Sequence, residues 1–232
     1  MLALATSLPS PNPPAFAAGQ AVSAAIADRG VFEFSLAGKT IGTEVFEIRS
    51  SAEKVEAQAE IHLRVERDGK TIDVKTYPHL VLDNKLQPLT YTWKQKGSQS
   101  SQLEVDFRSS PVQARYKTVN GQEDRRDFDL AKDVLVLDDN VVHHYQLVVD
   151  RYALTAGGKQ TLTAFIPQEA LPGSLSIEKI GTEAPPVQGS TLNLHHLVIT
   201  TELAHVSLWV DEHRRLERIV IPEVQFEAVR EH

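Results

Sequence analysis

The chain has 232 residues, of which 41% are hydrophobic and 24% charged, as expected for a globular protein that buries a core. Its 24 Lys and Arg residues are interleaved with 31 Asp and Glu residues, which argues against nucleic-acid binding and against a polybasic membrane anchor. Cysteine is absent, so disulfides, thiolate metal sites and thiol catalysis are excluded.

Residues 1–28 form a signal-like or disordered N-terminal segment in which the first charged side chain is Asp28. Ala15-Phe16-Ala17 has the small-residue pattern of a signal-peptidase site, although the apolar run from Met1 to Leu8 is short and no Lys or Arg precedes it. This pattern predicts a periplasmic or secreted protein, and the alternative is a plain Pro/Ala-rich tail. No later run is long and apolar enough for a transmembrane segment.

Residues 29–232 are expected to form a single β-rich domain, because apolar and polar residues alternate through most of them. The turn signals Asp68-Gly69 and Asn120-Gly121 mark tight hairpins, and Pro78 separates two strands. The expected strands are Val31 to Leu36, Ile41 to Ile48, Lys54 to Glu66, Thr71 to Tyr77, His79 to Leu82, Leu89 to Lys96, Leu103 to Phe107, Val112 to Val119, Gln160 to Ile166, Leu175 to Ile180, Leu192 to Ile199, Leu203 to Val210, Leu216 to Ile221 and Val224 to Val229.

One interval has the period of a helix. Asp138 or Asp139 can cap its start, and the glycines of Ala156-Gly157-Gly158 can end it. Between them, the spacing i, i+4, i+7, i+11 predicts a broad apolar face that packs on the sheet. The residues at these four positions are Val141, Tyr145, Val148 and Tyr152.

These elements predict a mainly β protein: a large antiparallel curved sheet or half-barrel of about a dozen strands with one central helix. If the helix fills the concave side only in part, an apolar cavity remains for a ligand. The residues expected to line it are Trp93, Tyr145, Val148, Tyr152 and Trp209. The alternative is that these side chains are ordinary core residues.

The histidines are candidates for metal ligands or for acid/base groups. If the chain turns at Thr201-Glu202, His196 and His205 fall diagonally on one face of a hairpin, but no third ligand accompanies them, so no metal site is expected. His143 and His144 could form an acid/base cluster with the two Asp residues that precede them. Helix capping explains those Asp residues without catalysis.

Motifs of the common catalytic classes are absent from the sequence. It has no Gly-x-Ser-x-Gly nucleophile elbow, no phosphate-binding Gly loop and no His-Glu-x-x-His helix. We therefore assign no catalytic residue and no cofactor, and a histidine-based hydrolase or metalloenzyme is the least favoured class.

Short segments resemble the open β-barrel lipoprotein carriers LolA and LolB and related envelope proteins. They are Gly38-Lys39-Thr40-Ile41-Gly42 between the first two strands, and Leu208-Trp209-Val210-Asp211 leading into Arg215-Leu216 and Ile219 to Pro222. The resemblance implies a curved sheet around a helix and an apolar ligand. The chain departs from it in two extra strand-rich stretches and in lacking a lipobox Cys.

The leading hypothesis is a non-catalytic secreted or periplasmic protein that binds a lipid-like or other apolar small molecule, or a lipidated protein. The alternative is an envelope interaction or structural module whose interior is completely packed.

Overall fold

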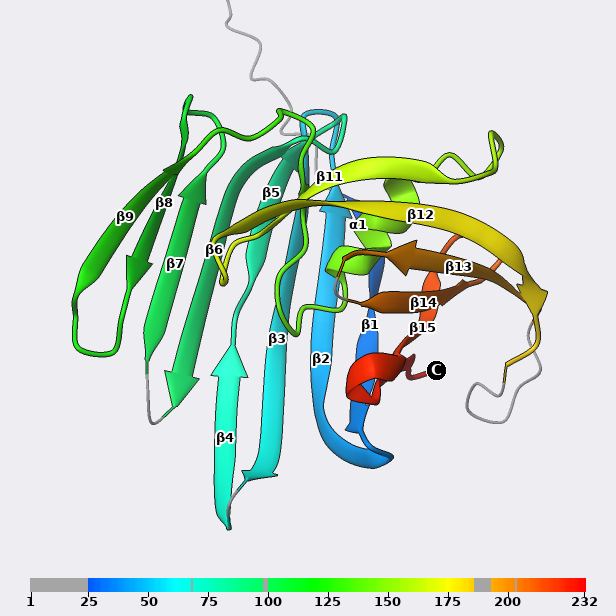
Figure 1. Cartoon of the computed structure of the whole chain (residues 1–232), viewed down its shortest axis with the longest axis horizontal. Coiled ribbons are helices and arrows are strands. Elements are labelled where there is room, and N and C mark those ends of the chain that lie inside the picture. The colour runs from blue at the N-terminus through cyan, green and yellow to red at the C-terminus, as the bar shows by residue number, and fades with distance from the viewer. Residues whose placement is uncertain (1–24, 68, 98–99, 186–192, 203) are drawn as a thin grey trace, which may run out of the picture.

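The computed structural model describes residues 25–67, 69–97, 100–185, 193–202 and 204–232. In these residues, sixteen strands form a single sheet that accompanies one α-helix (Figure 1). The predicted class, a mainly β protein with a large antiparallel sheet and one helix, is confirmed, although the strands outnumber the expected dozen. The described residues contain no helix with the length and apolar character needed to cross a membrane.

In the first half of the sheet, each strand pairs antiparallel with the next. Strands β4 and β5 together occupy one place in this order. Both pair with β3 on one side and with β6 on the other, so they lie end to end between these strands. The strands of this half are β1 (Ala25–Leu36), β2 (Lys39–Ser50), β3 (Lys54–Arg67), β4 (Lys70–Thr76), β5 (His79–Asp83), β6 (Pro88–Gly97), β7 (Ser101–Asp106), β8 (Val112–Lys117) and β9 (Glu123–Phe128).

The second half is joined to the first by pairing of β16 with β1. It is antiparallel except for the short β10, which runs parallel to β11. Its elements are β10 (Leu135–Val136), β11 (Gln160–Ile166), β12 (Leu171–Glu183), β13 (Leu194–Thr200), β14 (His205–Val210), β15 (Leu216–Ile221), the 3-10 turn η1 (Pro222–Val224) and β16 (Phe226–Arg230).

The sheet is curved so strongly that β11 to β14 run across the direction of β1 to β7 (Figure 1). Its two ends meet through side chains: the Phe165 ring of β11 lies 4.8 Å from the Phe128 ring and 6.3 Å from the Phe107 ring, measured between centroids. The Tyr116 hydroxyl also donates to the carbonyl of Pro167 at 3.0 Å. The inner face therefore encloses one continuous apolar core.

Helix α1 (His144–Arg151) is shorter than the apolar spacing predicts. Asn140 has a φ of 58°, a left-handed conformation that prevents a helix from starting at Asp138 or Asp139. At the other end, Tyr152 is extended, with φ −69° and ψ 124°. The apolar face still packs inward, and Val148 and Tyr152 are buried.

Both ends of α1 are held by side chains from distant strands and turns. Glu44 of β2 accepts hydrogen bonds from the backbone N–H groups of Val142 and His143, each at 2.7 Å. Arg214, in the turn before β15, donates to the carbonyls of Val149 and Tyr152. An acid at the N-terminus and a base at the C-terminus both match the helix dipole, so these contacts fix the helix on the inner face.

Candidate functional site

The break between β4 and β5 creates a hollow on the outer face of the sheet. Pro78 has no N–H to donate, and the strand line is interrupted at Tyr77-Pro78 before β5 begins at His79. Neighbouring strands hold the break in place, because Ala59 N–H donates to the Pro78 carbonyl at 3.2 Å and Tyr77 N–H donates to the Lys94 carbonyl at 2.8 Å. The interruption is thus a fixed feature of the sheet.

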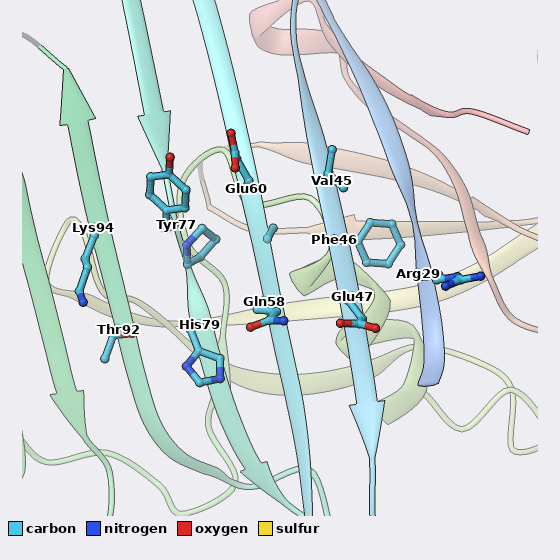
Figure 2. A pocket seen from close by; sticks show the side chains of 12 residues that line it. Arg29, Val45, Phe46, Glu47, Gln58, Glu60, Tyr77, His79, Thr92 and Lys94 are labelled. Carbon is cyan, nitrogen blue, oxygen red and sulfur yellow. The ribbon is translucent and has the colours of Figure 1, made fainter. Parts of the chain in front are cut away.

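The hollow has a volume of about 620 Å³, within the range of roughly 300–1,000 Å³ typical of small-molecule sites. Figure 2 shows its side chains spread over β1, β2, β3, the β4–β5 break and β6, with Arg29 at one side and Lys94 at the other. Val45, which is 54% exposed, contributes apolar surface between them. The lining residues are Arg29, Val45, Phe46, Glu47, Gln58, Ala59, Glu60, Tyr77, Pro78, His79, Thr92 and Lys94.

The acids of the hollow already have basic partners, whereas two of its bases do not. Glu47 pairs with Arg49 at 2.9 Å, and Glu60 pairs with Lys75 at 2.8 Å. The hydrogen bond from Lys75 lowers the pKa of Glu60, which keeps that carboxyl ionised and paired. Within the described part of the chain, no ion pair engages Arg29 or Lys94. The hollow is therefore suited to a ligand with an acidic group.

A second outer hollow, of about 570 Å³, lies on the other side of β6 and shares Thr92 with the first. Four of its charged side chains form two pairs: Arg108 with Asp106 at 2.8 Å, and Arg115 with Glu104 at 3.7 Å. These pairs leave less free charge for a ligand, so the hollow beside the β4–β5 break is the stronger candidate.

The five residues predicted to line an inner cavity do not form one site. Trp93, Val148 and Tyr152 are buried in the main core, and Tyr145 packs against it. Trp209 belongs to a separate small cluster with Leu194. It stacks on His196 with ring centroids 4.5 Å apart, and the Arg218 guanidinium lies 4.8 Å from its ring centre. None of the five lines the hollow.

A buried polar cluster lies on the inner face at the start of α1. Besides its two backbone bonds, Glu44 binds His143 Nδ1 at 2.8 Å. The backbone N–H of Asp138 donates to His144 Nδ1 at 3.3 Å, and the Tyr91 hydroxyl donates to Asp138 Oδ2 at 2.5 Å. Asp138 thus binds Tyr91 instead of capping the helix, contrary to the sequence prediction. Glu44 takes the capping role.

Burial dominates the electrostatics of this cluster. It holds the pKa of His144 well below its usual value, and the neighbouring His143 acts in the same direction. Burial also raises the pKa of Tyr91 well above its usual value, so that hydroxyl stays a donor to Asp138. The Nε2 atoms of His143 and His144 are buried without a hydrogen-bond partner in the described residues. The cluster acts as an internal anchor closed to solvent.

The predicted hairpin between β13 and β14 is present, but its two histidines do not converge. His196 pairs with Trp209 and His205 with Thr200, so the histidines lie four residues apart along β13, roughly 13 Å at strand spacing. Each has its own acid: His196 contacts Glu183 at 3.0 Å, and His205 contacts Glu223 at 2.9 Å. The register keeps the two histidines on one face of the hairpin, as expected, but four residues apart along the strands instead of on neighbouring diagonal positions.

Sequence reasoning missed several polar residues that line the hollow, among them Arg29, Gln58, His79, Thr92 and Lys94. One signal could have found the place: Pro78 falls inside a run of strand residues, where proline marks a break in hydrogen bonding. The lining itself follows only from the pairing of β3 with both β4 and β5.

Comparisons with known proteins assign no family. No family model and no curated protein matches the chain. A crystal structure of a DUF1089 family protein from Pseudomonas aeruginosa is similar, with a TM-score of 0.46 and 12% sequence identity over 78% of this chain and 90% of that one. A likeness at this level supports no inference about function, so the proposals below rest on the geometry of the chain itself.

Proposed function

We propose that the protein is a non-catalytic carrier that binds an elongated, lipid-like molecule with an acidic group in the outer hollow beside the β4–β5 break. The observation behind this proposal is a hollow of small-molecule size that combines apolar surface with two unpaired cations, Arg29 and Lys94. An acidic group gains a charge-assisted hydrogen bond from either cation, and the apolar body covers Val45 and Tyr77.

The spacing of the two cations favours a long ligand over a small anion. Arg29 lies on β1 and Lys94 on β6, with β2, β3 and the β4–β5 line between them. Four interstrand steps correspond to roughly 19 Å, too far for one phosphate or carboxylate to bridge. A fatty acid can place its carboxylate at one cation and its chain along the strands' outer side chains.

This proposal keeps the lipid-like ligand predicted from the sequence but moves it to the other face of the sheet. Export to the periplasm or the outside, where such a carrier would meet lipids, stays a prediction. Its basis, Ala15-Phe16-Ala17, lies outside the described residues.

Laurate titration tests the proposal, with 1-anilinonaphthalene-8-sulfonate as a fluorescent competitor. We expect laurate to bind the natural protein and the double variant Arg29→Ala, Lys94→Ala to lose about tenfold or more in affinity, because a charged hydrogen bond contributes roughly 1.5–3 kcal/mol. Lys159→Ala, an exposed lysine in the loop before β11, is the matched control and should bind as the natural protein does. Equal laurate affinity in the double variant and the control would reject the site.

A second function, an interaction or structural module with a filled interior, is favoured by the burial of α1. Val148 is 0% exposed and Tyr152 is 1% exposed, as expected for a packed core. Val148→Phe should then destabilise the fold by about 1–3 kcal/mol through overpacking. A module of this kind would bind neither laurate nor the dye, and the titration above separates the two functions.

A further inference from the structure

We propose that occupation of the outer hollow is coupled to the anchoring of α1 on the inner face, and that Phe46 carries the coupling. The inference rests on the proposed function, because it concerns regulation of the same hollow. Its physical basis is that one strand, β2, contributes to both places.

Strand β2 presents alternate side chains to the two faces of the sheet. Val45 and Glu47 line the hollow, whereas Glu44 and Phe46 are buried toward the core. Successive residues of a strand point to opposite sides, so a ligand that holds Val45 and Glu47 also restrains the backbone carrying Glu44 and Phe46.

Phe46 contacts both environments. Phe46 is one of the lining residues of the hollow, and Figure 2 shows its ring between β2 and β1. The residue opposite it on β1 is Gly30, and a Cβ there would lie 3.1 Å from the Phe46 ring. The absence of a side chain on Gly30 therefore leaves room for the ring at this point of the sheet.

The inner side of Phe46 touches the helix anchor. Its ring stacks on His143 with centroids 6.0 Å apart and planes inclined by 8°. His143 is also bound by Glu44, the next inward-facing residue on the same strand. Release of the start of α1 thus requires His143 to separate from both inward side chains of β2.

The expected coupling is positive and reciprocal. A ligand across Val45, Phe46 and Glu47 makes the opening of β2 less frequent, and the amides anchored by Glu44 then open less often. By linkage, laurate binds more weakly by the same factor when the anchor is released. The contact of β2 with the first turn of α1 is therefore the part of the structure that switches between an anchored and a released state.

Amide hydrogen exchange with and without saturating laurate is the test. Binding slows all amides that exchange through global unfolding by a common factor, which core amides such as Leu197 and Ile199 report. Residues 142–146 report the coupling through local opening, in which they exchange faster than the core amides. Laurate leaves a local opening unchanged if that opening does not affect the hollow. We expect a slowing of about fivefold or more at residues 142–146, up to the factor of the core amides.

Two conservative variants of β2 test whether Phe46 carries the coupling. Phe46→Leu keeps an apolar side chain but removes the ring stack on His143, so laurate should no longer slow the local exchange of residues 142–146. Ile48→Leu, at the next inward position, is the matched control and should retain the slowing. Slowing of residues 142–146 that survives in Phe46→Leu, or that is absent from the natural protein, overturns the coupling.

The outcomes separate this inference from the proposed function. If laurate does not bind the natural protein, the proposed function fails and the coupling fails with it. If laurate binds but the exchange of residues 142–146 is unchanged, the coupling alone fails.

Discussion

At the scale of single residues, Glu44 is the side chain on which the inner structure most depends. Its carboxylate is fully buried and accepts three hydrogen bonds from the start of α1. A buried acceptor with three donors is costly to remove, because the N–H groups left behind have no access to water. Nothing in the local sequence around residue 44 indicates this role, since its partners are about 100 positions away.

Glu44→Gln should lower the free energy of unfolding by about 1.5–3 kcal/mol, the usual range for hydrogen bonds to a charged group. Urea denaturation measures the change. The exposed Glu33→Gln, on neighbouring β1, is the control and should stay within about 0.5 kcal/mol of the natural protein. A similar small effect for Glu44→Gln would show that the helix start is held by other contacts.

Asp138 predicts a specific pH dependence of stability. Burial raises its pKa above the usual 3.8, although hydrogen bonds from Tyr91 and Gln168 oppose the shift. A raised carboxyl pKa means that the folded state favours the protonated form, so this contribution is complete below the unfolded-state pKa. It is lost as pH rises through the folded-state pKa.

The stability of the natural protein relative to Asp138→Asn should therefore fall as pH rises from about 4 toward neutrality. Urea midpoints of both proteins at several pH values give this difference directly. A difference that stays constant or grows with pH would mean that the environment of Asp138 favours its ionised form.

At the scale of elements, sequence periodicity identified nearly all strands, because alternation reflects a sheet with one buried face. It identified the hairpin of β13 and β14, although β13 ends at Thr200 and β14 begins only at His205, and it overextended the helix. The apolar positions Val141 and Tyr152 do face the core, yet Asn140 and the extended Tyr152 limit the helix to 144–151. The spacing of apolar residues indicates which side of a helix is buried. It does not indicate where distant groups such as Glu44 and Arg214 cap the ends of α1.

The hollow could not be predicted for a related reason. Arg29 and Lys94 are 65 positions apart in the sequence. They line the same hollow only because strands β1 to β6 pair in one sheet. Arg29 and Lys94 lack acidic partners because the acids of the hollow, Glu47 and Glu60, pair with Arg49 and Lys75 instead. Such pairings are properties of the assembled sheet.

Substitution of Arg214 tests how the C-terminal end of α1 is capped. Its side chain binds the last carbonyls of the helix, while its backbone has a φ of 66°. Arg214→Ala should lose about 1.5–3 kcal/mol of stability through the charged hydrogen bonds. Arg214→Gly should lose about 1 kcal/mol less, because glycine adopts positive φ without steric cost.

Thermal or urea unfolding of the two variants separates the side-chain and backbone contributions. Equal stability of Arg214→Ala and Arg214→Gly would contradict the left-handed conformation. Stability of both equal to the natural protein would contradict the capping role.

At the scale of the whole molecule, the sheet encloses a packed interior and leaves the hollow beside the β4–β5 break on the outside. The interior is filled by α1 and its polar anchor, and the outer face is interrupted where Pro78 breaks the strand line. Two valines distinguish the two faces of the sheet: Val45 lies exposed on the outside and Val148 is buried inside.

Intermolecular nuclear Overhauser effects between laurate methylenes and valine methyl groups test this arrangement most directly. The account predicts contacts from bound laurate to the Val45 methyls and none to the Val148 methyls. Contacts to Val148 without contacts to Val45 would place the ligand inside the sheet and contradict the outer hollow as the binding site.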